Sequence, residues 1–591
     1  MNLKAELERR ITAALAACGA PAGSPAIIAQ AGRSEFGDYQ ANGIMPAAKA
    51  LGAKPRDLAE KVIVQLSPGG AGDLSDLAEP PTVAGPGFIN IRLKADWLAR
   101  QLGAVGGDEH LGVQRAEGKS RQTVVVDYSG PNLAKEMHVG HLRSTIIGDA
   151  LARVLDFLGH KTIRQNHVGD WGTQFGMLIQ YMEEKTGYKT VGVTAVGPLS
   201  MLADLEEFYR KAKALYDEDP SFATRARERV VKLQQGDYLT RLGWQWFLAE
   251  SVSHVSAVYK RLEVLLQATD VRGESAYNDD LPKVVEDLRK AGLLKESQGA
   301  QCVFLPQFRD KEGHELPLIV QKTDEGYLYA TTDLAAIRYR VRELKADRIL
   351  YVTDSRQALH FRQVFAVARA AKFAPPAVLL EHVAFGMMLG ADGKPFKTRE
   401  GGTVKLMALL DEAEQRAFDL VTEKSPELDE ARRREIARVV GIGAVKYADL
   451  AQNRTSDYVF AWDKMLSLEG NTAPYMQYAY ARIRSIFRKD QTNGSSQKGD
   501  VLIREPAERA LALKLVQFPE TVAAVAAECL PNVLCAYLYD LAGAFMGFYE
   551  SCPVLQSAPP LRDSRLALCG LTARTIQTGL KLLGIQTIEQ M

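Results

Sequence analysis

The stretch Tyr128-Ser-Gly-Pro-Asn-Leu-Ala-Lys-Glu-Met-His-Val-Gly-His141 lies where a short apolar run gives way to a segment with helical periodicity. Residues 123–126 before it are apolar and mostly β-branched, which predicts a buried strand. Apolar residues then recur at helical spacing from Leu142 to Leu158. Unpaired amides in the first turn of a helix attract phosphate, and a glycine lets a ligand approach the backbone closely. The pattern therefore predicts a nucleotide site at the start of this helix.

Two histidines in this stretch are candidates to bind the nucleotide. His138 and His141 can each donate a hydrogen bond to a phosphate or adenosine oxygen, and Gly140 leaves room for the ligand. A zinc site and a pair of surface histidines are the alternatives. Zinc usually takes four protein ligands, but no cysteine pair lies nearby, and His160 and His167 follow at no recognisable ligand spacing. A short motif alone does not exclude surface histidines.

The block from Asp127 to Gly176 resembles the signature region of class I aminoacyl-tRNA synthetases. Three of its elements are similar to arginyl-tRNA synthetases in particular: Ser-Gly-Pro-Asn132, Leu142-Arg-Ser-Thr-Ile-Ile-Gly148 and Asn166-His-Val-Gly-Asp-Trp-Gly-Thr-Gln-Phe-Gly176. The resemblance implies that Lys135, His138 and His141 stabilise charge during the reaction rather than transfer protons.

A second element, Gly390-Ala-Asp-Gly-Lys-Pro-Phe-Lys-Thr-Arg-Glu-Gly-Gly402, is similar to the mobile lysine-bearing loop of the same class. The usual lysine-methionine-serine-lysine core is replaced here by Lys394-Pro-Phe-Lys397, so no hydroxyl role carries over. Lys394, Lys397 and Arg399 can bind ATP and neutralise charge on a departing pyrophosphate. Taken without the upstream histidines, these residues are more typical of an exposed hairpin turn with solvated lysines, whereas together with the histidines they favour the nucleotide-binding loop.

The substrate of the resembled family is arginine, whose planar, charged guanidinium requires carboxylates and fixed hydrogen-bond acceptors. The resemblance assigns Tyr329 and Asp333 to binding the guanidinium. It assigns three further residues to positioning the rest of the substrate: Asn132, Glu274 and Gln357. Each residue also has a structural interpretation. Asp333 could cap a helix that starts at Leu334, and Glu274 or Gln357 could be solvated loop residues.

The pattern of the chain predicts several domains. Between residues 116 and 405, strand-like runs alternate with helices, as in an α/β fold with a Rossmann-like, doubly wound parallel sheet, and residues 183–250 form a helical insertion. Ligands bind at the carboxyl edge of such a sheet, so elements roughly 250 residues apart can share one nucleotide. Residues 1–115 form a small α+β domain, 406–465 a helical connecting region and 466–591 an all-α domain.

The flanking domains carry the resemblance further. Glu35-Phe-Gly-Asp-Tyr-Gln40 and Gly85-Pro-Gly-Phe-Ile-Asn90 are similar to the N-terminal domain of the family, which approaches the tRNA elbow. Residues 471–484 interleave tyrosines with arginines, which suits base stacking beside phosphates, although aromatic residues at helical spacing usually build cores. That segment and residues 582–591 resemble the anticodon-binding domain of the family, which implies four tRNA contacts: Tyr475, Tyr478, Arg482 and Met591.

Composition sets limits but does not point to RNA. The 591 residues are 46% hydrophobic and 25% charged, with a formal net charge of +1, so a positive surface for nucleic acid must be local. Six cysteines without metal spacing are typical of a reducing compartment, which predicts a cytoplasmic protein. The N-terminus has no signal-peptide pattern, and polar residues interrupt the apolar region 521–549, so we expect no membrane segment.

The resemblance spans nearly the whole chain and implies an arginine–tRNA ligase. Such an enzyme activates L-arginine with ATP to arginyl-adenylate and pyrophosphate, then transfers arginine to the terminal adenosine of tRNA(Arg). We expect a monomer without its own metal site, with Mg²⁺ carried by ATP, and adenylate formation that requires tRNA. Two alternatives stay open: a nucleotidyltransferase that adenylylates a small carboxylate without RNA, and an inactive RNA-binding paralogue.

Overall fold

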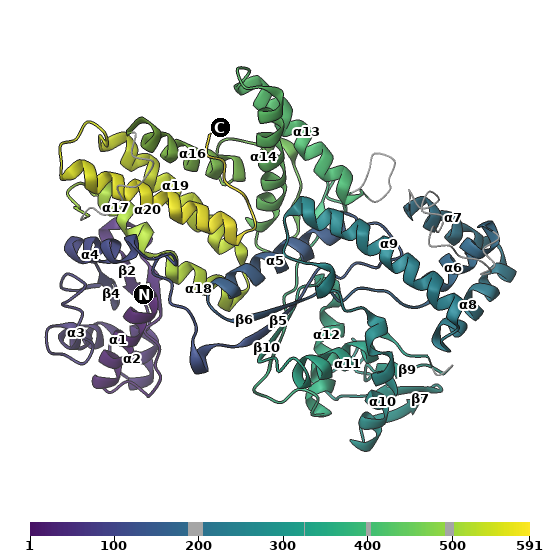
Figure 1. Ribbon diagram of the computed structural model, residues 1–591. Coiled ribbons are helices and arrows are strands. Elements are labelled where there is room, and N and C mark those ends of the chain that lie inside the picture. The colour runs from purple at the N-terminus through teal and green to yellow at the C-terminus, as the bar shows by residue number, and fades with distance from the viewer. Residues whose placement is uncertain (187–204, 324–325, 397–403, 491–500, 591) are drawn as a thin grey trace. The chain divides into compact units, whose positions relative to one another are not determined.

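The computed structural model describes residues 1–186, 205–323, 326–396, 404–490 and 501–590 (Figure 1). The chain divides into two compact units. The first comprises Met1–Arg115, Ser467–Leu582 and Gln586–Met591, and the second comprises Ala116–Leu466 and Leu583–Ile585. The candidate catalytic residues all belong to the second unit, which we call the catalytic unit.

A parallel sheet lies at the centre of the catalytic unit, as the strand–helix alternation predicts. Its four strands follow the order β11-β10-β5-β6, with these bounds: β5 (Thr123–Asp127), β6 (Lys161–Gln165), β10 (Arg348–Tyr351) and β11 (Leu379–His382). The chain continues from β5 to β6 on one side, whereas β10 and β11 lie on the other side. The strand order therefore reverses between β5 and β10, which is where doubly wound sheets bind ligands.

Helices cover both faces of this sheet (Figure 1). Helix α5 (Leu142–Phe157) lies on one side, and α11 (Tyr329–Arg342) and α12 (Ala358–Ala370) lie on the other. The apolar run of β5 is buried, as its β-branched composition requires. Val125 of β5 packs in one core with Leu334 of α11 and Val364 of α12. The observed architecture confirms the α/β fold class.

Additional elements extend the catalytic unit. The insertion contains α6 (Thr173–Thr186), α7 (Leu205–Glu218), α8 (Pro220–Gln234) and α9 (Tyr238–Leu262). A small antiparallel sheet follows, with α10 (Leu281–Lys290), β7 (Leu294–Ser297), β8 (Ala300–Val303) and β9 (Leu318–Gln321). The unit continues with β12 (Met388–Leu389), α13 (Leu406–Lys424), α14 (Glu430–Leu450), β13 (Tyr458–Val459) and α15 (Trp462–Met465).

The other unit joins the two ends of the chain. Its N-terminal part has a sheet of order β1-β2-β4-β3 with these elements: α1 (Leu3–Ala17), β1 (Ile28–Gln30), β2 (Tyr39–Ala41), α2 (Ile44–Leu51), α3 (Pro55–Leu66), β3 (Thr82–Ala84), β4 (Phe88–Ile91) and α4 (Ala95–Gly106). Its C-terminal part is helical: α16 (Ala473–Asp490), α17 (Pro506–Val516), α18 (Phe518–Glu528), α19 (Pro531–Ser551) and α20 (Leu561–Leu582).

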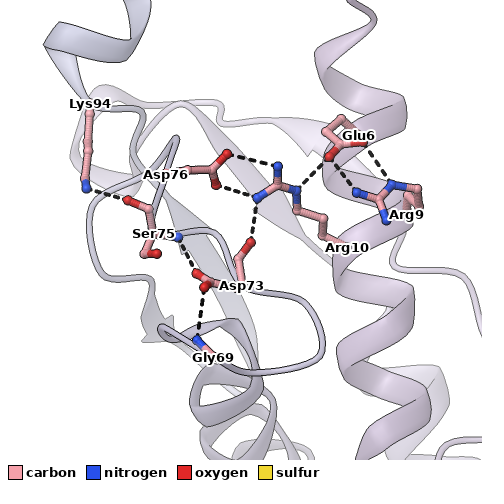
Figure 2. Close-up of polar contacts among 8 residues, drawn as sticks. All are labelled: Glu6, Arg9, Arg10, Gly69, Asp73, Ser75, Asp76 and Lys94. Carbon is pink, nitrogen blue, oxygen red and sulfur yellow. Dashed lines mark hydrogen bonds and ion pairs between the residues drawn. The ribbon is translucent and has the colours of Figure 1, made fainter.

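A polar network fixes α1 to the loop that follows α3 (Figure 2). The guanidinium of Arg10 donates to the carbonyl of Asp73 at 2.6 Å and to the carboxylate of Asp76 at 2.5 and 3.1 Å. Glu6 accepts hydrogen bonds from Arg9 and Arg10, and these two guanidinium groups hold the pKa of its carboxyl at about 2. The opposite face of α1 is buried, so this helix has the amphipathic character that its sequence predicts.

One stretch of the helical part has the length and apolar character of a membrane span. Pro506–Glu528 comprises two helices, α17 and α18, which meet at Gln517, and 67% of its most apolar window is buried. Buried helices of a protein core give the same pattern.

Candidate active site

The turn after β5 is fixed by hydrogen bonds to neighbouring elements. Ser129 and Gly130 both have positive φ angles, of 72° and 52°, and this reverses the chain at the end of the strand. The Ser129 amide donates to Ser144 Oγ at 2.9 Å, and Ser144 Oγ donates to the carbonyl of Val352 at 2.6 Å. Residue 148 must be glycine, because a Cβ there would lie 2.2 Å from the Tyr128 side chain. The start of α5 is therefore held at the carboxyl ends of β5 and β10.

The two histidines lie side by side in the 3₁₀ turn η3 (Val139–His141), which leads into α5. Their ring centroids are 4.0 Å apart. His138 Nδ1 accepts the Gly140 amide and His141 Nδ1 accepts the His138 amide, both at 3.1 Å. Burial lowers the pKa of His138, with a further contribution from Lys135, and burial followed by the His138 ring lowers the pKa of His141 to about 3. Both rings are therefore neutral at pH 7, and each carries its proton on Nε2.

The two histidines belong to no group of three metal ligands among the described residues, whereas a zinc site takes three or four protein ligands. Among the described residues, the only group of three ligands close enough for a metal is Asp310, Glu312 and His314, in the loop between β8 and β9.

Lys135 and Glu136 contact other parts of the catalytic unit. The Lys135 ammonium lies 4.4 Å from the ring centroid of Tyr209 in α7, so the insertion reaches the signature stretch through a cation–π contact. The Glu136 carboxylate lies 3.1 Å from the ammonium of Lys405, which follows the lysine-bearing loop.

The segment that follows the lysine-bearing loop pairs with the signature stretch. The Val139 amide donates to the carbonyl of Val404 at 3.1 Å, and the Leu406 amide donates to the carbonyl of Met137 at 2.9 Å. At the N-terminal end, residues 388–396 form a tight hairpin that leaves Lys394 exposed. The hairpin interpretation is thus correct for this part of the loop. Lys397 and Arg399 lie outside the described residues.

Asp333 and Tyr329 lie on one helix. Helix α11 begins at Tyr329 with Leu328 as its N-cap, so the interpretation of Asp333 as the cap of a helix starting at Leu334 is wrong. Spaced four apart, the two residues share a face. Tyr329 is 72% exposed, whereas Asp333 is largely buried and lies 2.6 Å from His360 Nε2 of α12. His360 is therefore a further candidate for the site, and its residue type and spacing in the sequence did not indicate this contact.

Glu274 lies in a cluster of acidic side chains. It begins the 3₁₀ turn η6 (Glu274–Asp280), and burial, then Asp170 and then Asp333, raises the pKa of its carboxyl to about 7. Asp170 accepts hydrogen bonds from the Ser275 amide at 2.9 Å and from Ser275 Oγ at 2.6 Å, and so holds the turn in place. Three carboxylates near one another create a negative site suited to a cation.

The two remaining arginine candidates are Asn132 and Gln357. Asn132 pairs with Gly169, next to Asp170, and its side-chain oxygen accepts the Ala134 amide at 3.0 Å. Gln357 ends the 3₁₀ turn η7 (Ser355–Gln357) and is exposed, three residues before His360. The predicted residues thus come from the loop after β5, from η6, from the start of α11 and from the turn after β10. Asp170 was visible in the sequence only as part of a motif, because nothing in its spacing indicates that it contacts Ser275.

The candidate tRNA residues lie on α16 in the other unit. Tyr478 is 38% exposed, and its hydroxyl accepts a hydrogen bond from Arg482 at 3.0 Å. Tyr475 is half-buried against Tyr539, with ring centroids 5.8 Å apart. Met591 lies outside the described residues.

Three family models match successive parts of the chain. The model described as tRNA synthetases class I (R), catalytic domain, matches residues 108–462. The arginyl tRNA synthetase N terminal domain matches residues 5–93, and the DALR anticodon binding domain matches residues 476–591.

Complete proteins match as well. The arginine–tRNA ligases of Hahella chejuensis and Cellvibrio japonicus are 57% and 56% identical to this chain, and each match covers 100% of both sequences. The crystal structure of arginyl-tRNA synthetase from Plasmodium falciparum has a TM-score of 0.84 at 30% identity, and covers 100% of this chain and 99% of its own. The arginyl-tRNA synthetase of Thermus thermophilus has a TM-score of 0.81 at 26% identity, with both chains fully covered. The sheet edge that gathers the histidine motif, the lysine-bearing segment and the acidic cluster thus lies within a class I catalytic domain, and the chain belongs to the arginyl-tRNA synthetase family.

Proposed function

We propose that this chain joins arginine to tRNA(Arg) at the expense of ATP, the activity for which its relatives are named. The observation that carries the proposal is the convergence of a phosphate-binding motif and a cation-binding cluster at one sheet edge. His138 and His141 lie in the turn that leads into α5, whereas Glu274 begins η6 and Asp333 lies in the first turns of α11, and the charges of Asp170 and Asp333 both raise the pKa of Glu274. ATP and arginine can therefore meet across this edge.

In the first step, the arginine carboxylate attacks the α-phosphorus of ATP in line, and pyrophosphate leaves. The Nε2–H groups of His138 and His141 donate to phosphate oxygens as neutral dipoles. Lys135, Lys394, Lys397 and Arg399 neutralise the charge that develops on pyrophosphate. A hydroxyl of the terminal tRNA ribose then attacks the carbonyl carbon of the adenylate, and AMP leaves. No protein nucleophile is required, so catalysis depends on positioning and charge stabilisation.

The acidic cluster binds the amino acid. Asp333 and Tyr329 accept the guanidinium, and Asn132, Glu274 and Gln357 position the remainder of the substrate. His360 fixes the position of the Asp333 carboxylate through a contact of 2.6 Å between His360 Nε2 and Asp333 Oδ2. Asp170 holds η6 in place through Ser275, which keeps Glu274 facing the cluster.

The remaining partners follow from the same assignment. Magnesium enters with ATP and is held mainly by phosphate and water oxygens. The tRNA contacts Tyr475, Tyr478 and Arg482 and is required for adenylate formation. We further propose a cytoplasmic monomer. The six cysteines are free thiols, as a reducing compartment requires.

ATP–pyrophosphate exchange tests this proposal, measured for each amino acid with and without tRNA, alongside charging of labelled amino acid onto tRNA. We expect exchange with arginine alone, dependent on tRNA(Arg), and loss of turnover in Asp333→Ala with the fold retained. Exchange with another carboxylate and no RNA would instead indicate a nucleotidyltransferase. Tight tRNA binding without exchange or charging would indicate an inactive paralogue.

A further inference from the structure

Arg143 is a buried charge in the first turn of α5, two residues after His141. Its side chain is 2% exposed, and its partner Asp449 in α14 is fully buried, with Nε 3.1 Å from the carboxylate. Such a pair contributes little net stability, because burying two charges costs about as much as their attraction returns. Stability alone therefore does not explain why a buried arginine lies so close to the histidine motif.

The guanidinium of Arg143 connects two segments that are distant in sequence. Nη1 donates to the carbonyl of Gly386 at 2.7 Å and to the carbonyl of Ser456 at 3.1 Å. The rings of Phe385 and Tyr458 lie against the same guanidinium, with centroids 5.7 and 5.1 Å away. One side chain thus holds the residues that precede β12 and the residues that lead into β13.

The two segments touch directly at Gly386. A Cβ at this position would lie 2.6 Å from Asp457 Oδ1 and 2.6 Å from the carbonyl carbon of Ser456. The Gly386 amide donates to the carbonyl of Arg454 at 2.8 Å, and the Met387 amide donates to Asp457 Oδ1 at 2.6 Å. The contact therefore requires a glycine and leaves little freedom to shift.

A short series of backbone hydrogen bonds connects Lys394 to this contact at Gly386. Strand β12 pairs in parallel with β13 immediately after Gly386. The Phe396 amide then donates to the carbonyl of Met388 at 3.1 Å, and the Gly390 amide donates to the carbonyl of Lys394 at 2.8 Å. Because the hairpin is tight, the position of Gly386 sets the position of Lys394.

We infer that Arg143 is a positioning residue, which holds the hairpin carrying Lys394 at a fixed distance from the histidine motif so that both contact one nucleotide. Arginine suits this role, since its planar group presents several donors at once and stays charged when buried. Lysine at this position keeps the charge but has a single nitrogen, so it cannot face Asp449 with one nitrogen and donate to both carbonyls with another, as Nε and Nη1 of Arg143 do. The inference rests on the proposed function and adds to it a residue that does not itself touch ATP.

The test compares four variants by ATP–pyrophosphate exchange with arginine and tRNA, with melting temperatures measured in parallel. They are Arg143→Lys, Lys394→Ala, the double variant, and Arg348→Lys as the control. Arg348 is 8% exposed and forms a two-bond pair with Glu381 at 2.6 and 2.9 Å, at the amino end of β10. The control therefore perturbs a comparable buried pair of the same unit away from the loop.

We expect Arg143→Lys to lower the exchange kcat by about tenfold to a hundredfold, the cost of a small misplacement, with the KM for arginine unchanged. Arg348→Lys should stay near wild type. The double variant should be no slower than Lys394→Ala, because Arg143 acts through Lys394. Multiplying effects in the double variant, or equal activity of Arg143→Lys and Arg348→Lys, would overturn the inference. Should Arg143→Lys fail to fold, Gly386→Ala perturbs the same contact from the other side, with the same expected result and the same refutation.

These outcomes are distinct from failure of the proposed function. If the wild-type chain does not exchange pyrophosphate with arginine, the function is wrong whatever Arg143 does. If the wild type exchanges and Lys394→Ala slows it, the function stands and the comparison decides on Arg143 alone.

Discussion

Arginine binding should weaken as the pH falls through 7, because Glu274 loses its charge in that range. Burial, Asp170 and Asp333 raise the pKa of Glu274 to about 7 in the free protein. A bound guanidinium or ammonium favours the ionised carboxylate and so lowers this pKa on binding. Protonation therefore competes with arginine: the carboxylate is ionised above pH 7 and neutral below it.

The size of the effect follows from the pKa. A group that titrates at pH 7 is about nine-tenths ionised at pH 8 and about one-tenth ionised at pH 6. If only the ionised form binds arginine well, the Kd at pH 6 is about tenfold higher than at pH 8. At pH 7, binding should release about half a proton.

Isothermal titration calorimetry measures both quantities, at constant ionic strength, in two buffers that differ in ionisation enthalpy. Glu274→Gln isolates the contribution of Glu274, since this variant should bind arginine more weakly than wild type at pH 8 and differ little from it at pH 6. A wild-type Kd that varies less than twofold between pH 6 and 8, or an unchanged pH dependence in Glu274→Gln, would refute the reasoning.

Three further results are expected from the same structure. At saturating arginine, the exchange kcat should show no step between pH 6 and 8 that depends on His141, since burial and the His138 ring lower its pKa to about 3; a pH–rate profile checks this. Tyr209→Leu removes the ring beside the Lys135 ammonium and should raise the KM for ATP a few-fold, by about 0.5–1 kcal/mol, whereas Tyr209→Phe should behave as wild type in steady-state kinetics. Tyr39→Phe removes a hydroxyl that lies 3.0 Å from both oxygens of the buried Glu520 carboxylate, and urea unfolding should show a loss of about 1–3 kcal/mol.

The sequence predicted the parallel sheet and its covering helices well, for a physical reason. The run at 123–126 must be buried on both faces, and the helical periodicity after Leu142 requires a helix that packs on it. These local patterns determine where the loops at the carboxyl edge lie. Residue types in and near those loops, such as the histidines of η3 and Asp333 of α11, then indicate the chemistry.

Contacts across the fold could not be predicted in the same way. Arg143 appears in the sequence only as a neighbour of His141, and nothing at 386 or 456 indicates that their carbonyls converge on it. Likewise, the spacing of Glu274 and Asp333 gives no sign that their charges interact and raise a pKa. Such contacts depend on how loops pack after the sheet has formed, and no periodicity records them.

The motif at residues 35–40 shows that residues which match a family motif can serve packing as well as binding. Asp38 and Tyr39 are buried, and they contact α17 and α18 rather than solvent: Arg509 donates to both Asp38 oxygens at 2.9 and 2.7 Å, and Glu520 accepts from Tyr39. Gln40 donates to Asn90 of the second motif at 2.8 Å. Asp38 and Tyr39 are buried and hydrogen-bonded inside this unit, so they cannot contact RNA unless those hydrogen bonds break. Any tRNA contact made by this segment must therefore come from its exposed part, at Phe36 and its neighbours.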